Sequence, residues 1–361
     1  MRLSLLLCIL SLFTIISCSS NTDSIDPEPT PTGLYFPPID SDAWEVSSAS
    51  ELGWNTSNIQ TLLDFIEEKD TKAFIILKDG KIVIEWYGNE ADATTNLAWN
   101  SAAKTLSAFT IGIAQDEGFL DINNASRNYL GEGWSNLTSE QEENISVWNH
   151  LTMTTGLDYD VDNNNCTDLE CFLYKNEPET FWYYHNGAYT VTHNIIEGAV
   201  NTDFNSYFNE KLKNKIGMQG SWIPFGYFKL YYSNARSMAR YGLLNLNNGV
   251  WGDITVLNSQ NYFIEMTTTS QNLNKSYGYF WWLNGKTSYR LPASEDEFLG
   301  KLIPNAPNDL IASLGKDDQK LYVIPSQNLV IVRMGDDAGE TLLGPGSFDN
   351  NLWEKINAVI N

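Results

Sequence analysis

The chain has 361 residues, of which 42% are hydrophobic, so it is long enough to bury the core of one large domain or two modest ones. Its 45 acidic and 22 basic residues give a formal net charge of −23, which would repel nucleic acid phosphates. These figures exclude a disordered or fibrous chain and argue against nucleic acid as a partner; the acidity itself is that of a solvated surface.

The first twenty residues have the pattern of an export signal. Arg2 precedes an apolar run over residues 3–16, which is too short to span a bilayer, and small residues and Cys18 follow it. Because this ending resembles a bacterial lipobox, we predict that Cys18 is lipidated and anchors a secreted bacterial cell-envelope protein, in the periplasm or at the outer membrane. A plain secretory signal or a short core helix is the alternative interpretation.

Two further segments complete the predicted organisation. Residues 21–43 are rich in Pro, Ser, Thr and Asp, a composition that is typical of an extended tether. The folded domain is therefore expected to begin near Trp44 and to cover residues 44–361.

The domain is expected to open with a helix and a hairpin. Residues 58–69 have helical spacing, and Thr56 or Ser57 is placed to cap that helix. Two β-rich runs follow at residues 73–77 and 82–87, and the Asp-Gly pair between them is typical of a type I′ hairpin turn.

The middle of the chain is expected to be mostly helical. Residues 101–117 are apolar almost all round, as in a helix that is buried at the centre of a domain. Residues 123–218 are rich in Asn, Asp, Trp and Tyr with short helical patterns, so they predict a helical lobe. Residues 233–246 predict one more helix.

The last part of the domain has strand patterns and one final helix. Strand-like stretches occupy residues 277–283, 310–314, 320–324 and 329–334, and an amphipathic helix is expected over residues 351–360. Both ends of the domain would then meet on one antiparallel sheet. The predicted fold class is therefore α/β, with helices flanking an antiparallel sheet and a mostly helical lobe beside it.

The cysteines and histidines limit the kinds of site that the chain can form. Cys166 and Cys171 share one loop, and in an oxidising compartment they predict a local disulfide, with two free thiols as the alternative. The only histidines, His150, His185 and His193, form no zinc-type cluster with these cysteines. We therefore predict no metal site.

Ser101 and Lys104 are the leading candidates for catalysis. A serine hydroxyl needs an adjacent base at neutral pH, and a lysine three residues later lies on the same face of a helix. Burial would favour the neutral amine of Lys104, and the helix start would aim backbone N–H groups at an oxyanion. The alternative is an ordinary helix start with a solvated lysine.

Because such short spacings also arise by chance, two other pairs of residues must be considered. Ser313 and Lys316 repeat the serine-to-lysine spacing, but they fall in a strand, where such a pair points to opposite faces. Tyr184 and Asn186 offer a phenol for proton transfer and an amide for holding a substrate carbonyl. A rival Tyr-x-Asn triplet ends at Asn234 and runs into a helix, where the asparagine is more simply a cap.

Taken in order, Ser101-x-x-Lys104, Tyr184-x-Asn186 and the late segment around Lys316 resemble the three motifs of serine β-lactamases and penicillin-recognising enzymes. The sequence is most similar to the class C β-lactamase-related hydrolases, which include esterases, D-peptidases and 6-aminohexanoate-dimer hydrolases. The resemblance covers nearly all of the mature chain and implies a β-lactamase/transpeptidase-like fold.

The resemblance also implies a role for each motif residue. Ser101 would be acylated, and Lys104 and Tyr184 would share the general base and general acid work. Asn186 would orient the substrate or the lysine. The backbone N–H groups of Ser101 and Gln319 would form the oxyanion hole.

The third motif departs from the family pattern. Lys316-Asp317-Asp318 stands where the family usually has Lys-Thr-Gly or His-x-Gly. The usual hydroxyl helps to bind a carboxylate, which Asp317 would repel, unless this side chain points away to the surface. Native β-lactamase or DD-peptidase activity is therefore disfavoured, and the expected substrate is a neutral or cationic ester or amide, as a small molecule or short peptide.

The leading hypothesis is a serine hydrolase that cleaves esters or amides through an acyl-enzyme, without a metal or an organic cofactor. An inactive surface lipoprotein that binds peptidoglycan or glycan through its aromatic residues is the alternative from another class. A Ser-His-Asp hydrolase is disfavoured because the chain has no Gly-x-Ser-x-Gly elbow. The aromatic run at residues 277–282 is more simply assigned to the core.

Overall fold

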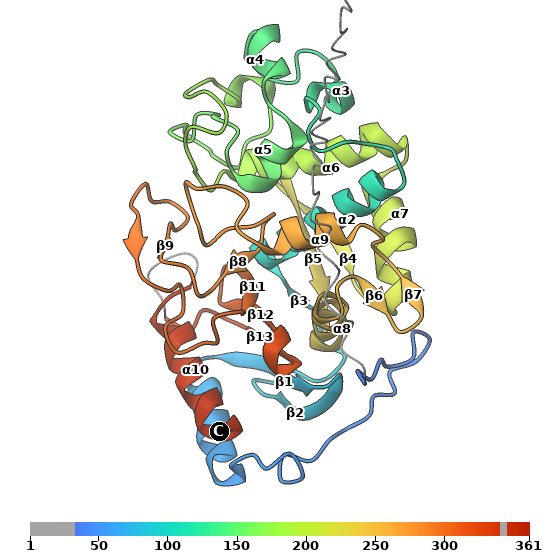
Figure 1. The fold of residues 1–361 in the computed structure, drawn as a ribbon, viewed down its shortest axis with the longest axis vertical. Helices are drawn as coiled ribbons and strands as arrows, with labels where there is room; N and C mark the ends of the chain where they lie inside the picture. The colour runs from blue at the N-terminus through green and yellow to red at the C-terminus, as the bar shows by residue number, and fades with distance from the viewer. Residues whose placement is uncertain (1–32, 340–344) are drawn as a thin grey trace, which may run out of the picture.

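A six-stranded antiparallel sheet forms one half of the molecule (Figure 1). The computed structural model describes residues 33–339 and 345–361, so the predicted signal, Cys18 and the first part of the tether lie outside the described residues. The strand order in the sheet is β2-β1-β13-β12-β11-β8. These strands are β1 (Thr71–Lys78), β2 (Lys81–Tyr87), β8 (Trp282–Leu283), β11 (Ile311–Gly315), β12 (Gln319–Ile324) and β13 (Leu329–Gly335).

Both ends of the domain meet on this sheet, as the sequence predicts. β1 lies between its hairpin partner β2 and the last strand β13, and Phe74 of β1 stands opposite Arg333 of β13. The turn between β1 and β2 contains Asp79 and Gly80, with φ angles of 50° and 82°. Positive φ at both positions is what a type I′ turn requires, so the predicted hairpin is confirmed.

The helices carry most of the remaining chain. They are α1 (Ile59–Glu68), α2 (Lys104–Asp116), α3 (Arg127–Leu130), α4 (Ser139–Glu143), α5 (Val147–Thr152), α6 (Asn186–Val200), α7 (Phe204–Phe208), α8 (Ala235–Leu246), α9 (Gln260–Thr267) and α10 (Ser347–Ile360). Short 3-10 turns lie at Thr56–Asn58, Asn100–Ala103, Leu169–Cys171, Asn214–Ile216 and Pro325–Gln327, and a π-helical turn at Asn209–Lys213.

Helices cover both faces of the sheet. Leu321 and Tyr322 are neighbours on β12, so their side chains point to opposite faces. A side chain added to Gly242 of α8 would meet Leu321, whereas Trp353 of α10 packs on Tyr322. α8 and α10 therefore lie on opposite faces, and α10 contacts α1 next to the sheet.

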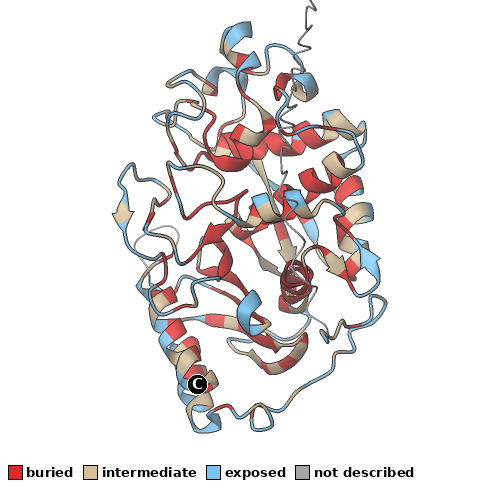
Figure 2. Cartoon of the chain, viewed as in Figure 1, coloured by how far each residue is buried: buried red, intermediate tan, exposed pale blue. Residues whose placement is uncertain are grey.

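α3 to α7 lie within residues 123–218, where the sequence predicts a helical lobe, and they occupy the upper part of Figure 1. α2 lies below α6 in this view, and its residues 104–114 are all buried, as Figure 2 shows by colour. Complete burial agrees with the prediction of a helix at the centre of the domain. α2 and α6 contact each other, so this helix joins the lobe to the rest of the molecule.

A second sheet of three strands, β3-β5-β4, was not predicted. Its strands are β3 (Leu97–Ala98), β4 (Ser221–Phe225) and β5 (Phe228–Ser233). Two-stranded pairs complete the fold, formed by β6 (Val250–Trp251) with β7 (Ile254–Thr255) and by β9 (Ser288–Tyr289) with β10 (Phe298–Leu299). None of the helices described is both long enough and apolar enough to cross a membrane.

Two local predictions are wrong. Of residues 277–283, only the last two belong to a strand, and Phe280 interrupts the run with a φ of 62°, which is incompatible with extended backbone. Neither Thr56 nor Ser57 caps α1, because both lie in a 3-10 turn and the Ser57 hydroxyl donates to Asn55.

The start of the folded part also differs from the expectation. Contacts with the domain start ahead of Trp44: Leu34 packs against the core, and the Tyr35 backbone N–H donates to the Asp79 carbonyl at 3.0 Å. The Arg240 guanidinium, on α8, then donates to the carbonyls of Pro38 and Ser41. Residues 35–41 are thus held against the domain by backbone hydrogen bonds.

Candidate active site

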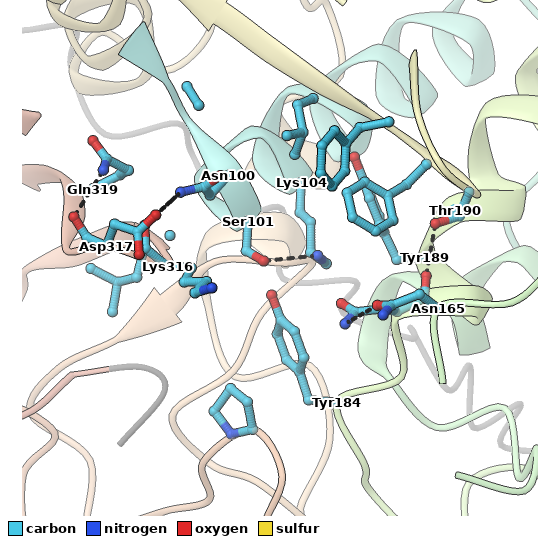
Figure 3. Close-up of a pocket in the computed structure, with 18 of the residues that line it drawn as sticks. Asn100, Ser101, Lys104, Asn165, Tyr184, Tyr189, Thr190, Lys316, Asp317 and Gln319 are labelled. Carbon is cyan, nitrogen blue, oxygen red and sulfur yellow. Dashed lines mark hydrogen bonds between the residues drawn. The ribbon is translucent and has the colours of Figure 1, made fainter. Parts of the chain in front are cut away.

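A pocket of about 830 Å³ lies where the start of α2, the start of α6 and the turn between β11 and β12 converge. The structure brings six predicted site residues to this pocket: Ser101, Lys104, Tyr184, Asn186, Lys316 and Gln319. Figure 3 shows the side chains of Ser101, Lys104 and Tyr184 pointing toward one another. Segments far apart in the sequence therefore form one site.

Ser101 lies in the 3-10 turn Asn100–Ala103, which leads into α2. The turn begins with Asn100 in the left-handed region, at a φ of 50°. Behind it, the Ser313 hydroxyl of β11 donates to the Ala102 carbonyl at 2.6 Å. A side chain on Gly315 would come within 2.2 Å of the Trp99 carbonyl, so glycine permits β11 to approach the turn this closely.

Lys104 is the first residue of α2, and its side chain is buried. Its Nζ lies 3.1 Å from the Ser101 Oγ and over the rings of Tyr189 and Tyr184, at 4.2 and 5.1 Å from their centroids. Burial lowers the pKa of Lys104 from 10.5 to about 7. A large fraction of this amine is therefore neutral at neutral pH and can accept a proton from Ser101.

Tyr184 approaches the same hydroxyl from the other side of the pocket (Figure 3). Burial raises the pKa of Tyr184, and its hydrogen bond with Ser101 partly offsets that rise. The phenol therefore stays protonated near neutral pH and can donate a hydrogen bond or a proton. Its ring stacks on Trp282 at a centroid distance of 6.2 Å, which fixes its direction.

Asn186 begins α6, and its hydrogen bonds go to a neighbouring loop. Its Nδ2 donates to the Asn165 Oδ1 at 2.8 Å, and its backbone N–H donates to the Asn164 Oδ1 at 3.1 Å. The side chain lines the pocket, but the hydrogen-bond partner of Lys104 in this structure is Ser101. Of its two expected roles, the geometry favours orienting the substrate.

The turn between β11 and β12 brings the third motif to the pocket. The Asn100 side chain donates to the Lys316 carbonyl at 2.7 Å and to the Asp317 Oδ2 at 3.2 Å, which joins this turn to the turn that carries Ser101. Asp317 and Asp318 both have left-handed backbones, with φ of 59° and 55°, a conformation that aspartate tolerates. Asp317 lines the pocket, with its carboxylate hydrogen-bonded to Asn100.

Asp318 and Gln319 serve the turn itself through their side chains. Asp318 is buried away from the pocket and pairs with Lys320 at 3.0 Å. The Gln319 side chain donates to the carbonyls of Asp317 and Gly335. The predicted role of Gln319 in the oxyanion hole therefore concerns its backbone N–H and not its side chain.

The rival pairs of the sequence do not form a second site. Ser313 is buried and hydrogen-bonded behind the Ser101 turn, where it contacts Thr105 at 3.1 Å rather than a lysine. Asn234 caps α8, because its side chain accepts from the Ser237 backbone N–H at 2.9 Å. Cys166 and Cys171 form a disulfide with their Cα atoms 5.9 Å apart. The described residues contain no group of His, Cys, Asp and Glu that could hold a metal ion.

Several pocket residues were not predicted from the sequence. Asn100 and Tyr189 contact the predicted residues directly, and Asn165 holds Asn186. Phe225 and Phe228, at the tip of the β4–β5 hairpin, form an apolar wall of the pocket. Only Asn100, next to Ser101 in the chain, could have been found from its position, since the others reach the site through tertiary contacts.

Comparison with known proteins agrees with this geometry. The β-lactamase family model matches residues 64–342, which is more than half of the chain, whereas no curated protein matches the sequence. A Bacillus anthracis protein described as a 6-aminohexanoate-dimer hydrolase is 17% identical, with a TM-score of 0.66, and the match covers 90% of this chain and 88% of that one. A penicillin-binding protein homologue from Caulobacter crescentus is 11% identical, with a TM-score of 0.64 and coverages of 83% and 97%.

A third solved structure, a β-lactamase/D-alanine carboxypeptidase from Pseudomonas syringae, is 14% identical, with a TM-score of 0.62 and coverages of 85% and 98%. At these identities the solved structures show the shared fold alone. The family model adds the family, and it agrees with the resemblance that the three motifs of the sequence predict. The chain therefore belongs to the β-lactamase family, within the superfamily of penicillin-recognising serine hydrolases.

Proposed function

We propose that the protein hydrolyses an ester or amide bond through an acyl-enzyme on Ser101. One observation carries this proposal: the buried Lys104 Nζ lies 3.1 Å from the Ser101 Oγ, on the wall of an 830 Å³ pocket. A lysine with a pKa lowered to about 7 can act, at this distance, as a base for the serine proton. A purely structural role would not explain why the Lys104 amine is buried next to the Ser101 hydroxyl.

The proposed reaction has two halves. Ser101 Oγ bonds to the substrate carbonyl carbon while its proton passes to Lys104, and the backbone N–H groups of Ser101 and Gln319 stabilise the oxyanion. The bond to the leaving group then breaks, and Tyr184 delivers the proton that the leaving group needs, regaining one from Lys104. Water adds to the acyl-enzyme in the second half, which releases a carboxylic acid and restores the serine hydroxyl.

The position of Asp317 supports a neutral or cationic substrate, as a small molecule or a short peptide. Asp317 lines the pocket where the family usually has a hydroxyl that binds a carboxylate, and like charges would repel an anionic group there. Esters and amides without that carboxylate are therefore favoured over penicillins and over peptide termini.

We also propose that the protein acts in the bacterial cell envelope, tethered by lipid on Cys18. This proposal is supported by the export signal and the lipobox-like ending of the sequence. Metabolic labelling with a clickable fatty acid, compared between the unaltered protein and a Cys18→Ala variant, tests it. Equal labelling of the two proteins would overturn it.

Ser101→Ala tests the proposed function. Hydrolysis of p-nitrophenyl acetate should fall by on the order of 10⁶, as when serine enzymes lose their nucleophile. A fluorophosphonate should label the unaltered protein, and mass spectrometry of the peptides should place the adduct on Ser101 and not on Ser313. Retained hydrolysis in the variant would refute the proposal, and an unlabelled protein that is retained on peptidoglycan or glycan would favour the inactive binding scaffold.

A further inference from the structure

A loop over residues 163–171, which contains the disulfide Cys166–Cys171, lies against the first turn of α6. A side chain on Gly187, the second residue of α6, would come within 2.6 Å of the Cys166 carbonyl. The loop and the helix are thus in direct contact at the point where α6 carries Asn186 into the pocket. The three family motifs do not include this loop.

Three hydrogen bonds join the loop to α6. The Asn164 side chain accepts from the Asn186 backbone N–H at 3.1 Å, and the Asn164 carbonyl accepts from the Gly187 N–H at 2.9 Å. The Asn165 Oδ1 accepts from the Asn186 Nδ2 at 2.8 Å. The first two bonds satisfy N–H groups that every helix start leaves without an internal partner. The third acts on the pocket side chain itself.

The loop is held in its own shape and fastened at its far end. The Asn163 Oδ1 accepts from the Asn165 backbone N–H at 3.1 Å, and the Asn163 carbonyl accepts from the Cys166 N–H at 2.9 Å. Within the segment that the disulfide closes, the Tyr227 hydroxyl of the β4–β5 hairpin donates to Asp168 at 2.8 Å. These bonds therefore hold the backbone of Asn165 in place beside Asn186.

We propose that Asn165 is a positioning residue, which sets the direction of the Asn186 amide, and that the Cys166–Cys171 disulfide keeps it in place. This inference rests on the proposed function. The amide of a free asparagine turns about its side-chain bonds, so its donor and acceptor ends exchange places. Anchoring Nδ2 to Asn165 fixes which end meets the substrate, and misplacing a group by about 1 Å can cost up to about 100-fold in rate.

Three variants test this role. Asn165→Leu keeps the size of the side chain but removes the acceptor, and it should lower kcat/KM for p-nitrophenyl acetate by about 10- to 100-fold. Asn165→Asp keeps an acceptor oxygen and should recover most of that loss. Thr167→Val, in the same loop but outside the pocket lining, is the matched control and should hydrolyse the ester as the unaltered protein does.

The rate of fluorophosphonate labelling separates positioning from general damage. Labelling depends on Ser101 and Lys104, so it should stay within about twofold in Asn165→Leu while ester turnover falls. If both rates fall together, or if Asn165→Leu turns over the ester normally, the inference is overturned while the proposed function stands. If the unaltered protein is neither labelled nor active, the proposed function and this inference fail together.

Removing the disulfide gives a second, independent measurement. The double variant Cys166→Ser/Cys171→Ser should keep its labelling rate and lose part of its ester turnover. The loss should be smaller than in Asn165→Leu, because the loop keeps its hydrogen bonds. The melting temperature of each variant shows that the protein is folded. Normal turnover in the double variant would overturn the part of the proposal that concerns the disulfide.

Discussion

Two buried lysines stand in two regions of this molecule, and their surroundings are opposite. Lys104, at the pocket, is 5% exposed and faces a hydroxyl and two aromatic rings. Lys320, on β12 under the sheet, is 1% exposed and lies between Asp349 at 2.8 Å and Asp318 at 3.0 Å. Among the described residues, no carboxylate pairs with Lys104.

The surroundings give the two amines different charges. Burial acts alone on Lys104 and lowers its pKa to about 7. Burial would also lower the pKa of Lys320, but Asp349 and Asp318 outweigh it, so that this pKa is raised from 10.5. One amine is thus available as a base, and the other is a permanent cation that holds the turn after β11. A buried lysine can act as a catalytic base only where no carboxylate pairs with it.

The largest expected effect is on activity at the pocket. Lys104→Met should lower kcat for ester hydrolysis by on the order of 10³ to 10⁴, because the serine loses its base. The variant should also melt at a higher temperature at neutral pH, because between about pH 7 and pH 10.5 the unfolded chain binds a proton that the folded Lys104 gives up. A variant that is inactive and less stable would contradict the contrast between the two lysines.

The next effect is on stability under the sheet. Lys320→Met should lower the free energy of unfolding by roughly 3 to 5 kcal/mol, because it leaves two buried carboxylates without their cation. Lys355→Met is the control, since its ion pair with Glu354 is largely exposed and should matter little. Urea unfolding of the three proteins measures the difference, and equal midpoints for both variants would refute the structural role of Lys320.

The pH dependence of activity sharpens the contrast further. Lys104 must be neutral to accept the serine proton, so kcat/KM should rise about tenfold per pH unit up to about pH 7 and then level off. Burial lowers the pKa of His150 and His185 to about 4 and that of His193 to about 3, so these groups stay neutral over the range. A rate profile from pH 5 to 9 that keeps rising up to pH 9, or that stays flat, would contradict a lowered pKa of Lys104.

The smallest expected effect comes from the hydroxyl that completes the paired site. The Tyr322 hydroxyl donates to Asp349, and both groups are buried. Tyr322→Phe should therefore lower the free energy of unfolding by about 1 to 3 kcal/mol, because one buried carboxylate oxygen loses its donor. Thermal unfolding measures the shift, and ester turnover should be unchanged, since this tyrosine does not line the pocket. A loss of turnover without a loss of stability would count against this assignment.

Local signals in the sequence predicted much of the fold. The Asp79-Gly80 pair predicts the first hairpin, because its backbone preference is built into these two residues. The β4–β5 hairpin was missed because Pro224 interrupts the β pattern of β4. β4 lies at the edge of its sheet, where a proline is tolerated, and that position follows only from the tertiary structure.

The candidate site divides in the same way. Order along the chain was enough to predict that Ser101, Lys104 and Tyr184 belong together, and the structure places them around one pocket. Asn165 could not be predicted, because its role depends on a loop that folds back onto α6. The direction of Asp317 was left open by the sequence, and it is decided by a hydrogen bond from Asn100.

The pairing of β1 with β13 governs when this protein can fold. Phe74 finds its partner strand only after the chain has been synthesised as far as Arg333, so the central sheet cannot close on a growing polypeptide. Contacts between such distant residues also form slowly, because a long loop must be closed first. A chain whose central sheet closes only late stays unfolded for longer, which would suit the export that we propose for this protein.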